Sequence, residues 1–250
     1  MVTEVRTEIT DGVAVLTVSN PERRNAMNIE LSRRLVDAVR RAGDEGVGAV
    51  VVTGEDPAFC AGGDLGELAT ADPATLREVY SGFLAVADCP LPTVAAVNGA
   101  AVGAGLNLAL ACDLRLAGPR AKFDARFLPL GLHPGGGYTW MAQRVLGPQG
   151  AAALTLFGDV VDAAEAARIG LVHRVADDVV ATAVELAARA AAAPRDLVRT
   201  TKATMRLTAG MTTQAEAVEV EVRAQAESVR SAEFQQRLAD LQSTISRTGR

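Results

Sequence analysis

Two segments of small residues, Phe59–Leu65 and Asn98–Gly105, have the composition of sites that bind an anion through backbone amides. Small side chains let another molecule approach the main chain closely. The second segment leads into Leu106–Ala111, a run typical of a helix, and the first N–H groups of a helix have no partner within it. Such donors stabilise a negative charge that develops on an oxygen atom. Both segments are therefore predicted to hold an anionic oxygen.

Two further residues are candidates for proton transfer. His133 precedes Pro134 and a run of three glycines, and an imidazole gains and loses its proton near neutral pH. The alternative, a loop histidine hydrogen-bonded to the main chain, stays open. Asp124 is the second candidate, but the alternation of a strand places it on the same face as Arg126, which favours an ion pair over a catalytic acid.

Composition excludes several classes of protein. The 250 residues are 49% hydrophobic and 22% charged, which is typical of one main soluble domain with a sizeable core. A net charge of −5 argues against a nucleic-acid partner, because phosphate recognition needs a basic surface. No apolar run is long enough to span a membrane, so we expect a cytoplasmic protein. The three cysteines lack metal-ligand spacing, and neither a metal site nor a disulfide framework is predicted.

The elements that must position these segments alternate between strands and helices. Residues 5–9 and 13–18 alternate around Asp11-Gly12 and predict a hairpin. Asn28 is a predicted helix cap. The further predicted elements are strands at 49–53, 93–97 and 114–117 and helices at 73–87 and 104–111. This order predicts an α/β fold in which each glycine-rich segment follows a buried strand.

Beyond about residue 147 the composition becomes rich in Ala and Glu, which predicts a helical C-terminal part. Asp162 is predicted to cap a helix at 163–168, and residues 171–175 form a strand-like run. Further helices are predicted at 181–192, 195–207 and 213–247. The last of these carries an apolar stripe that fits an intrachain or subunit contact: Ala215, Val218, Val222, Ala226 and Val229.

Five ordered blocks of the sequence resemble the crotonase (enoyl-CoA hydratase/isomerase) superfamily, over roughly the first three quarters of the chain. The blocks are Asn20–Met27, Ala58–Leu65, Val97–Asp113, Leu130–Gly137 and Ala163–Val172. The resemblance implies a spiral of repeated ββα units over 1–190, a helical oligomerisation region over 191–250, and a homotrimer or homohexamer. It also implies an acyl-CoA substrate, with coenzyme A as part of that substrate and no further cofactor.

The resemblance assigns roles to individual residues. Family members bind the thioester carbonyl oxygen through two backbone N–H groups and stabilise an enolate-like anion; by position these donors are Gly63 and Ala104. The other implied substrate-binding residues are Ala61, Gly62, Asp64, Leu65, Phe127, Arg23 and Arg24, of which the two arginines would meet the nucleotide phosphates. Asp64 is also typical of a helix-capping carboxylate, and the arginines of a solvated loop.

The sequence departs from the family where hydratases carry two glutamates that place water and move its proton. Asn107 and Phe127 occupy these positions by matching. Phenylalanine cannot transfer a proton, and an amide is neither an acid nor a base near neutral pH. Asn107 retains the ability to hold water.

Three hypotheses follow. The first is an acyl-CoA enzyme, a lyase or isomerase of this family, that uses the backbone donors with altered proton-transfer residues such as His133. The second is a weak or inactive acyl-CoA-binding protein. The third is a hydratase that uses water held by Asn107 and a relocated base.

Overall fold

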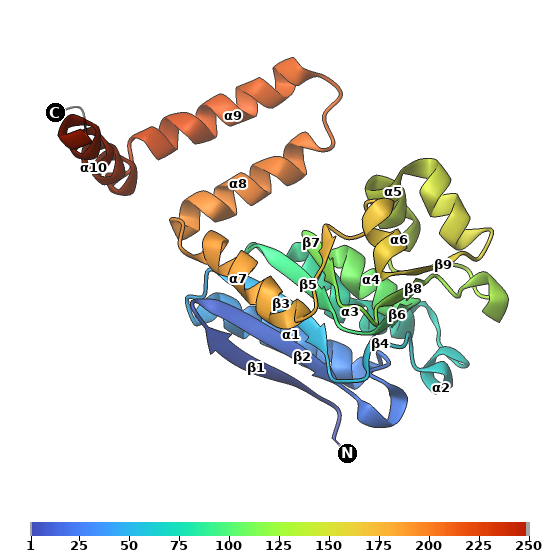
Figure 1. Cartoon of the computed structure of the whole chain (residues 1–250). Coiled ribbons are helices and arrows are strands. Elements are labelled where there is room, and N and C mark those ends of the chain that lie inside the picture. Colours follow the sequence, from blue (N-terminus) through green and yellow to red (C-terminus); the bar gives the residue numbers. More distant parts are fainter. Residues whose placement is uncertain (1, 249–250) are drawn as a thin grey trace. The chain divides into compact units, whose positions relative to one another are not determined.

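The structure, a computed structural model, describes residues 2–248. By contacts the chain divides into two compact units, Met1–Ala192 and Ala193–Arg250, and each is described by itself. Among the described residues, the first unit contains the strands β1 to β10 and the helices α1 to α7, and the second contains α8, α9 and α10 (Figure 1).

The larger of two sheets has six strands in the order β1-β2-β3-β5-β7-β10. Their bounds are Glu4–Thr10, Val13–Ser19, Ala49–Gly54, Thr93–Val97, Leu114–Ala117 and Arg174–Val175. β1 and β2 form the predicted hairpin, and positive φ angles at Asp11 and Gly12 make its tight turn. All the other neighbours in this sheet are parallel. The strand expected at 171–175 is shortened to its last two residues.

The smaller sheet has the order β4-β6-β8-β9, with bounds Ala58–Cys60, Ala100–Val102, Lys122–Asp124 and Val160–Asp162. The chain alternates between the sheets, so that β3 and β4, β5 and β6, and β7 and β8 each place one strand in each sheet before the next helices. The predicted ββα spiral is therefore confirmed. These three-residue strands are too short to show a period in the sequence, and the sequence missed most of them.

The predicted helices of the first unit form with small shifts at their ends. They are α1 (Ile29–Asp44), α3 (Pro73–Asp88), α4 (Ala104–Ala111), α6 (Ala163–Arg168) and α7 (Val179–Ala191), and short α2 (Leu65–Leu68) and 3-10 segments at Pro21–Arg23 and Leu128–Leu130 join them. Asn28 caps α1 by accepting a hydrogen bond from the Leu31 N–H at 2.7 Å. The sequence did not predict α5 (Tyr138–Thr155), which Gly147 and Pro148 kink internally.

Helices cover both faces of the larger sheet (Figure 1). Val50 and Val52 of β3 join the main core with residues of α1, α3 and α4. Ala49 and Val51 of the same strand pack with α7 through residues such as Ala183. All of β3 is buried because both of its faces are covered, and this explains its uninterrupted apolar run.

The second unit consists of α8 (Arg195–Thr208), α9 (Gln214–Val229) and α10 (Ala232–Thr248). The prediction of one helix over 213–247 is wrong. The first helix ends at Val229, and Ser231 starts the next by accepting a hydrogen bond from the Phe234 N–H at 3.1 Å. Within the stripe of α9, Val218, Val222 and Val229 are 43%, 53% and 43% exposed.

Candidate functional site

The smaller sheet brings the two glycine-rich segments together. β4 and β6 are parallel neighbours, with Ala58 paired to Ala100 and Cys60 to Ala101, so the segments that follow them leave the same edge of the sheet. The sequence placed both segments at the ends of the preceding β3 and β5 strands. In the structure each lies at the end of an additional short strand, which carries it to this shared edge.

The Gly63 N–H is available because the hydrogen bonds between this turn and Met27 are made by the residues before and after Gly63. The Met27 N–H donates to Gly62 O, and the Asp64 N–H donates to Met27 O, both at 2.8 Å. Gly62 has a φ of +122°, a conformation suited to glycine. No described residue accepts a hydrogen bond from the Gly63 N–H. One backbone donor therefore remains free at the first turn.

The Ala104 N–H is available because Ala104 is the first residue of α4. Gly103 caps this helix with φ +48° and ψ −110°, and its carbonyl accepts from the Asn107 N–H at 3.0 Å. Among residues 2–248 no acceptor contacts the Ala104 N–H. A Cβ on Gly105 would lie 2.0 Å from Cys60 O, so only glycine lets α4 approach the end of β4 this closely.

Both free donors line one cavity of about 210 Å³. Its wall comes from the two turns, α2, α3, α4 and the segment after β8. Most of the lining is apolar, and it contains no aspartate or glutamate among the described residues. The lining residues are Ala61, Gly62, Gly63, Leu65, Leu68, Val79, Tyr80, Val102, Gly103, Ala104, Asn107, Ala125, Arg126, Phe127, Leu130, Leu132, His133 and Gly135.

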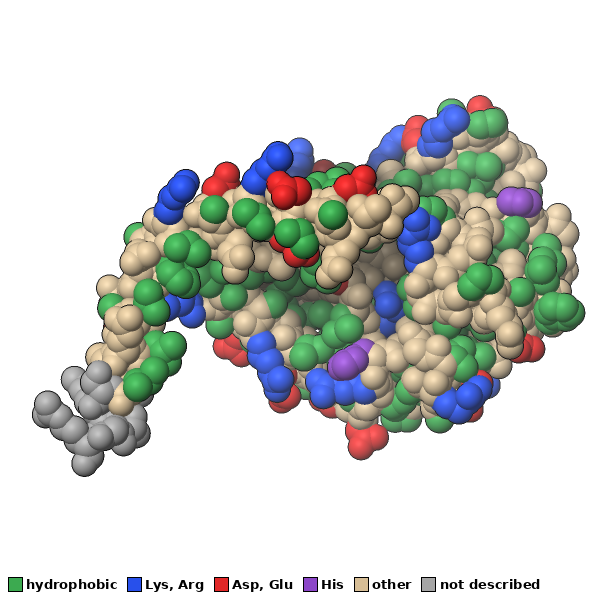
Figure 2. All heavy atoms as spheres, turned by 90° about the horizontal axis from the view of Figure 1, so that it is seen from above, with side chains coloured by type: hydrophobic (Ala, Val, Ile, Leu, Met, Phe, Trp, Pro, Cys, Tyr) green, Lys and Arg blue, Asp and Glu red, His purple; other side chains and the backbone are tan. Residues whose placement is uncertain are grey.

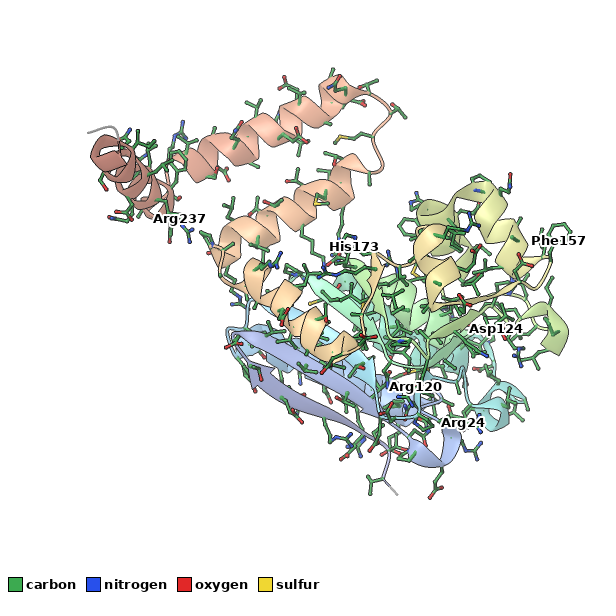
Figure 3. The ribbon with its side chains drawn as sticks, viewed as in Figure 1. Arg24, Arg120, Asp124, Phe157, His173 and Arg237 are labelled. Atoms are coloured by element: carbon green, nitrogen blue, oxygen red, sulfur yellow. The ribbon has the colours of Figure 1, made fainter. Side chains whose placement is uncertain are left out.

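Eight of the predicted site residues line this cavity: Ala61, Gly62, Gly63, Leu65, Ala104, Asn107, Phe127 and His133. Asp64 does not. It caps α2 by accepting from the Gly66 N–H at 2.8 Å, and it forms an ion pair with Arg23 at 3.0 Å. Arg24, labelled in Figure 3, is exposed and has the left-handed backbone that ends the Pro21–Arg23 segment.

Asp124 also lies outside the cavity lining. Asp124 is labelled in Figure 3. Its carboxylate accepts a hydrogen bond from Arg126 Nε at 2.8 Å and a second bond from the same guanidinium. The predicted ion pair between these two residues is confirmed. Arg126 has a φ of +52°, so it has left the strand and reaches Asp124 from a turn instead of from the same strand face. The carboxylate is therefore held by a cation, and Asp124 is not among the residues that line the cavity.

Asn107 is fixed from one side only. Its Nδ2 donates to Gly135 O at 2.9 Å, whereas its buried Oδ1 has no hydrogen-bond partner among the described residues. An unpaired buried acceptor costs about 1–3 kcal/mol. The ring of Phe127 packs against that of Tyr138, with 5.0 Å between the ring centroids, and makes this part of the wall apolar.

His133 is exposed at the cavity, and its Nδ1 lies 2.7 Å from Pro134 O. A carbonyl oxygen only accepts, so the Nδ1 carries the proton in this contact. In the neutral ring the lone pair is then on Nε2, which is the form of a base. The main-chain contact of the loop alternative is therefore present, and proton transfer by His133 stays a prediction.

The buried thiol of Cys60, at the first turn, is a poor nucleophile at neutral pH. Burial raises the pKa of its thiol to about 11, so the sulfur stays protonated at neutral pH. Its Sγ donates weakly to Gly62 O at 3.6 Å.

The sequence missed several lining residues, above all Tyr80 on α3 and Arg126. Leu76, Tyr80 and Phe83 recur at helical spacing, but this spacing alone does not indicate that the residues face a cavity. For Arg126, the positive φ that turns it to the cavity has no signal in an arginine.

Within the described residues no group of three or more His, Cys, Asp or Glu side chains could hold a metal ion. None of the helices formed by those residues has the length and apolar character needed to cross a membrane. Figure 2 shows Lys and Arg side chains interspersed with Asp and Glu on the face drawn, without one continuous basic patch.

Comparison with known families agrees with this geometry. Residues 8–243 match the family model described as enoyl-CoA hydratase/isomerase. The chain belongs to the enoyl-CoA hydratase/isomerase family. The predicted resemblance to the crotonase superfamily is thereby confirmed.

Individual relatives are similar over almost the whole chain. The probable enoyl-CoA hydratase EchA14 of Mycobacterium tuberculosis is 56% identical over 241 residues, which are 92% of this chain and 94% of that protein. An enoyl-CoA hydratase structure from Polaromonas sp. JS666 has a TM-score of 0.89 at 28% identity and covers 96% of this chain and 97% of its own. A Thermobifida fusca protein solved in complex with CoA has a TM-score of 0.81 at 32% identity, covering 96% and 95%.

Proposed function

We propose that the protein is an acyl-CoA enzyme that binds the thioester carbonyl oxygen between the N–H groups of Gly63 and Ala104. The observation that carries the proposal is that these two unpaired donors line one apolar cavity. Two such donors stabilise an enolate when charge moves from Cα to the carbonyl oxygen, and one donor typically contributes about 10²–10³ in rate. The mechanism needs no metal or separate cofactor.

The proton that leaves Cα goes to His133 in this proposal. Its Nε2 carries the lone pair while the contact from Nδ1 to Pro134 O holds the ring. The cavity wall offers no carboxylate as a base among the described residues, and the side chains of Asn107 and Phe127 cannot take the proton. Return of the proton to another carbon of the acyl group moves a double bond and makes the activity that of an isomerase. Expulsion of a hydroxyl group from Cβ, which leaves as water with the proton carried by His133, forms a double bond and makes it that of a lyase; both use non-standard proton-transfer residues.

The rest of the substrate follows from the surroundings of the two donors. Ala61, Gly62, Leu65 and Phe127 line the cavity and would contact the acyl group and thioester. We assign the CoA phosphates to Arg24, which is exposed, with Arg23 and Asp64 as a paired support beside it.

We further propose a homotrimer or homohexamer in which α9 and α10 contribute to the subunit contact. The exposed apolar side chains of these helices support the proposal, since stripes of this kind are normally covered. They are Val218, Val222, Val229, Phe234, Leu238, Leu241 and Ile245. Light scattering measures the number of subunits directly.

Deuterium incorporation tests enolate formation with a simple saturated thioester, whichever acyl group the natural substrate carries. Hexanoyl-CoA incubated with the enzyme in D2O should gain mass at Cα, followed by mass spectrometry. His133→Ala should lower the exchange rate by about 10²–10⁴, the usual contribution of a general base. His173→Ala is the matched control, because this exposed histidine does not line the cavity. Equal exchange by wild type and His133→Ala would contradict the assignment of the base.

The second candidate function is acyl-CoA binding without turnover. The lining without carboxylates favours it, because efficient hydration needs an acid and a base at the double bond. A panel of 2-enoyl-CoA thioesters decides between the two functions. Binding of these thioesters without any reaction, together with no deuterium exchange into hexanoyl-CoA, would support the binding protein. Turnover of any member of the panel would exclude it, and hydration would indicate water held at Asn107.

A further inference from the structure

The hydroxyl group of Tyr80 is a hydrogen-bond donor in the cavity that the described protein leaves unused. Tyr80 lies on α3, lines the cavity and is half-buried. Its ring packs 5.6 Å from the ring of Phe83, which restrains the direction of the hydroxyl. Burial raises the pKa of Tyr80, so the phenol is protonated at neutral pH and can donate. No described residue is hydrogen-bonded to it.

Gly135 makes the space for this hydroxyl. A Cβ on Gly135 would lie 2.2 Å from Tyr80 Oη and 3.0 Å from its Cζ, so any side chain there would displace the phenol. Gly135 does not have a positive φ, and its backbone conformation therefore does not itself require glycine. The Gly135 carbonyl already accepts from Asn107 Nδ2 at 2.9 Å. The hydroxyl thus lies against this backbone without using its acceptor.

The surroundings of Tyr80 give the hydroxyl a role in selecting the ligand. Leu68, Val79 and Leu132 make the cavity wall largely apolar, so a bound acyl chain displaces water from it. A hydrocarbon chain would leave the phenol unpaired, which weakens binding about 5- to 100-fold, whereas an oxygen atom on the chain would accept its hydrogen bond. Asn107 Oδ1, the buried acceptor without a partner among the described residues, lies in the same wall and would favour a hydroxyl over an oxo group.

We propose that Tyr80 is a specificity-determining residue that selects acyl-CoA thioesters whose acyl group carries an oxygen atom beyond the thioester, by donating a hydrogen bond to that oxygen. The inference rests on the proposed function, since it takes the thioester to lie in this cavity. It adds a contact that neither the two backbone donors nor His133 provide.

Calorimetry with four ligands tests the proposal: hexanoyl-CoA and its 3-, 4- and 5-hydroxy derivatives. Wild type should bind at least one hydroxy derivative about 5- to 100-fold more tightly than hexanoyl-CoA, the fold-change that corresponds to one satisfied phenol. Tyr80→Phe should reduce this preference to near unity and leave hexanoyl-CoA binding equal or tighter. Tyr138→Phe is the matched control, because its hydroxyl accepts from Thr155 Oγ1 at 3.2 Å and does not line the cavity; it should retain the preference.

Each outcome is decisive. Binding of hexanoyl-CoA by wild type with no preference for any hydroxy derivative would overturn the role of Tyr80 while leaving the proposed function intact. A preference that survives in Tyr80→Phe would also overturn it. Failure of wild type to bind any of the four thioesters would refute the proposed function itself. The comparison within wild type needs no variant to fold, and thermal unfolding checks the two variants.

Discussion

Ala104→Pro removes one proposed oxyanion donor without removing any hydrogen bond that stabilises the fold. Ala104 is the first residue of α4, and proline is well tolerated there because this N–H has no partner within the helix. The residue before a proline must avoid the α region, and Gly103 meets this requirement because its φ of +48° and ψ of −110° lie outside that region. We therefore expect the free energy of unfolding to change by less than about 1 kcal/mol.

The catalytic effect should be much larger than the effect on stability. With Gly63 as the only remaining donor, the rate of Cα deuterium exchange in hexanoyl-CoA should fall by about 10²–10³, or about 3–4 kcal/mol in the barrier. Ala104→Val is the control for bulk, since it adds two methyl groups at the same residue and keeps the N–H. The assay compares exchange rates at saturating thioester for the three proteins, with urea denaturation to measure their stabilities.

The interpretation requires a specific pattern. Ala104→Pro should be folded, should bind hexanoyl-CoA and should exchange slowly, whereas Ala104→Val should exchange within about tenfold of wild type, the range expected from a modest change of packing. A folded Ala104→Pro that exchanges at the rate of wild type would refute the assignment of this N–H. Equal losses in both variants would mean that bulk, and not the donor, limits the reaction.

Two further predictions concern stability. Gly136→Ala should lower the free energy of unfolding by roughly 2–4 kcal/mol in urea denaturation, from left-handed strain and overpacking. The φ of Gly136 is +64°, and a Cβ there would lie 2.4 Å from Phe83 Cζ. Gly137→Ala is the control, because Gly137 has a φ of +81° and open space around it and should lose only the strain contribution; equal losses in the two variants would contradict the clash. A hydrogen bond from Ser19 holds the pKa of Glu55 below its usual range, so this carboxylate stabilises the fold above about pH 4.3 and the effect is lost as the pH falls further. Glu55→Gln should therefore be less stable than wild type at pH 7, and the difference should shrink as the pH falls below about 4.3. A difference that does not change with pH would point to another cause.

Local patterns were enough to predict much of the first unit. The hairpin around Asp11-Gly12, the cap at Asn28 and the buried strand β3 depend on turn chemistry, a side chain that reaches the next turn, and an unbroken apolar run. These causes act between residues close in the chain, so a sequence displays them directly. The break between α9 and α10 was not predicted, because the apolar spacing continues across Arg230 and Ser231.

By itself the sequence determined the family and the two glycine-rich turns. Only the tertiary structure decided which groups share the cavity. The pairing of β4 with β6 places turns from distant parts of the chain side by side. The turn at Arg126 pairs its guanidinium with Asp124, which does not line the cavity, and the packing of α3 places Tyr80 in the cavity wall. These outcomes depend on contacts between distant segments, whose free energy comes from burial and register and leaves no local period in the chain.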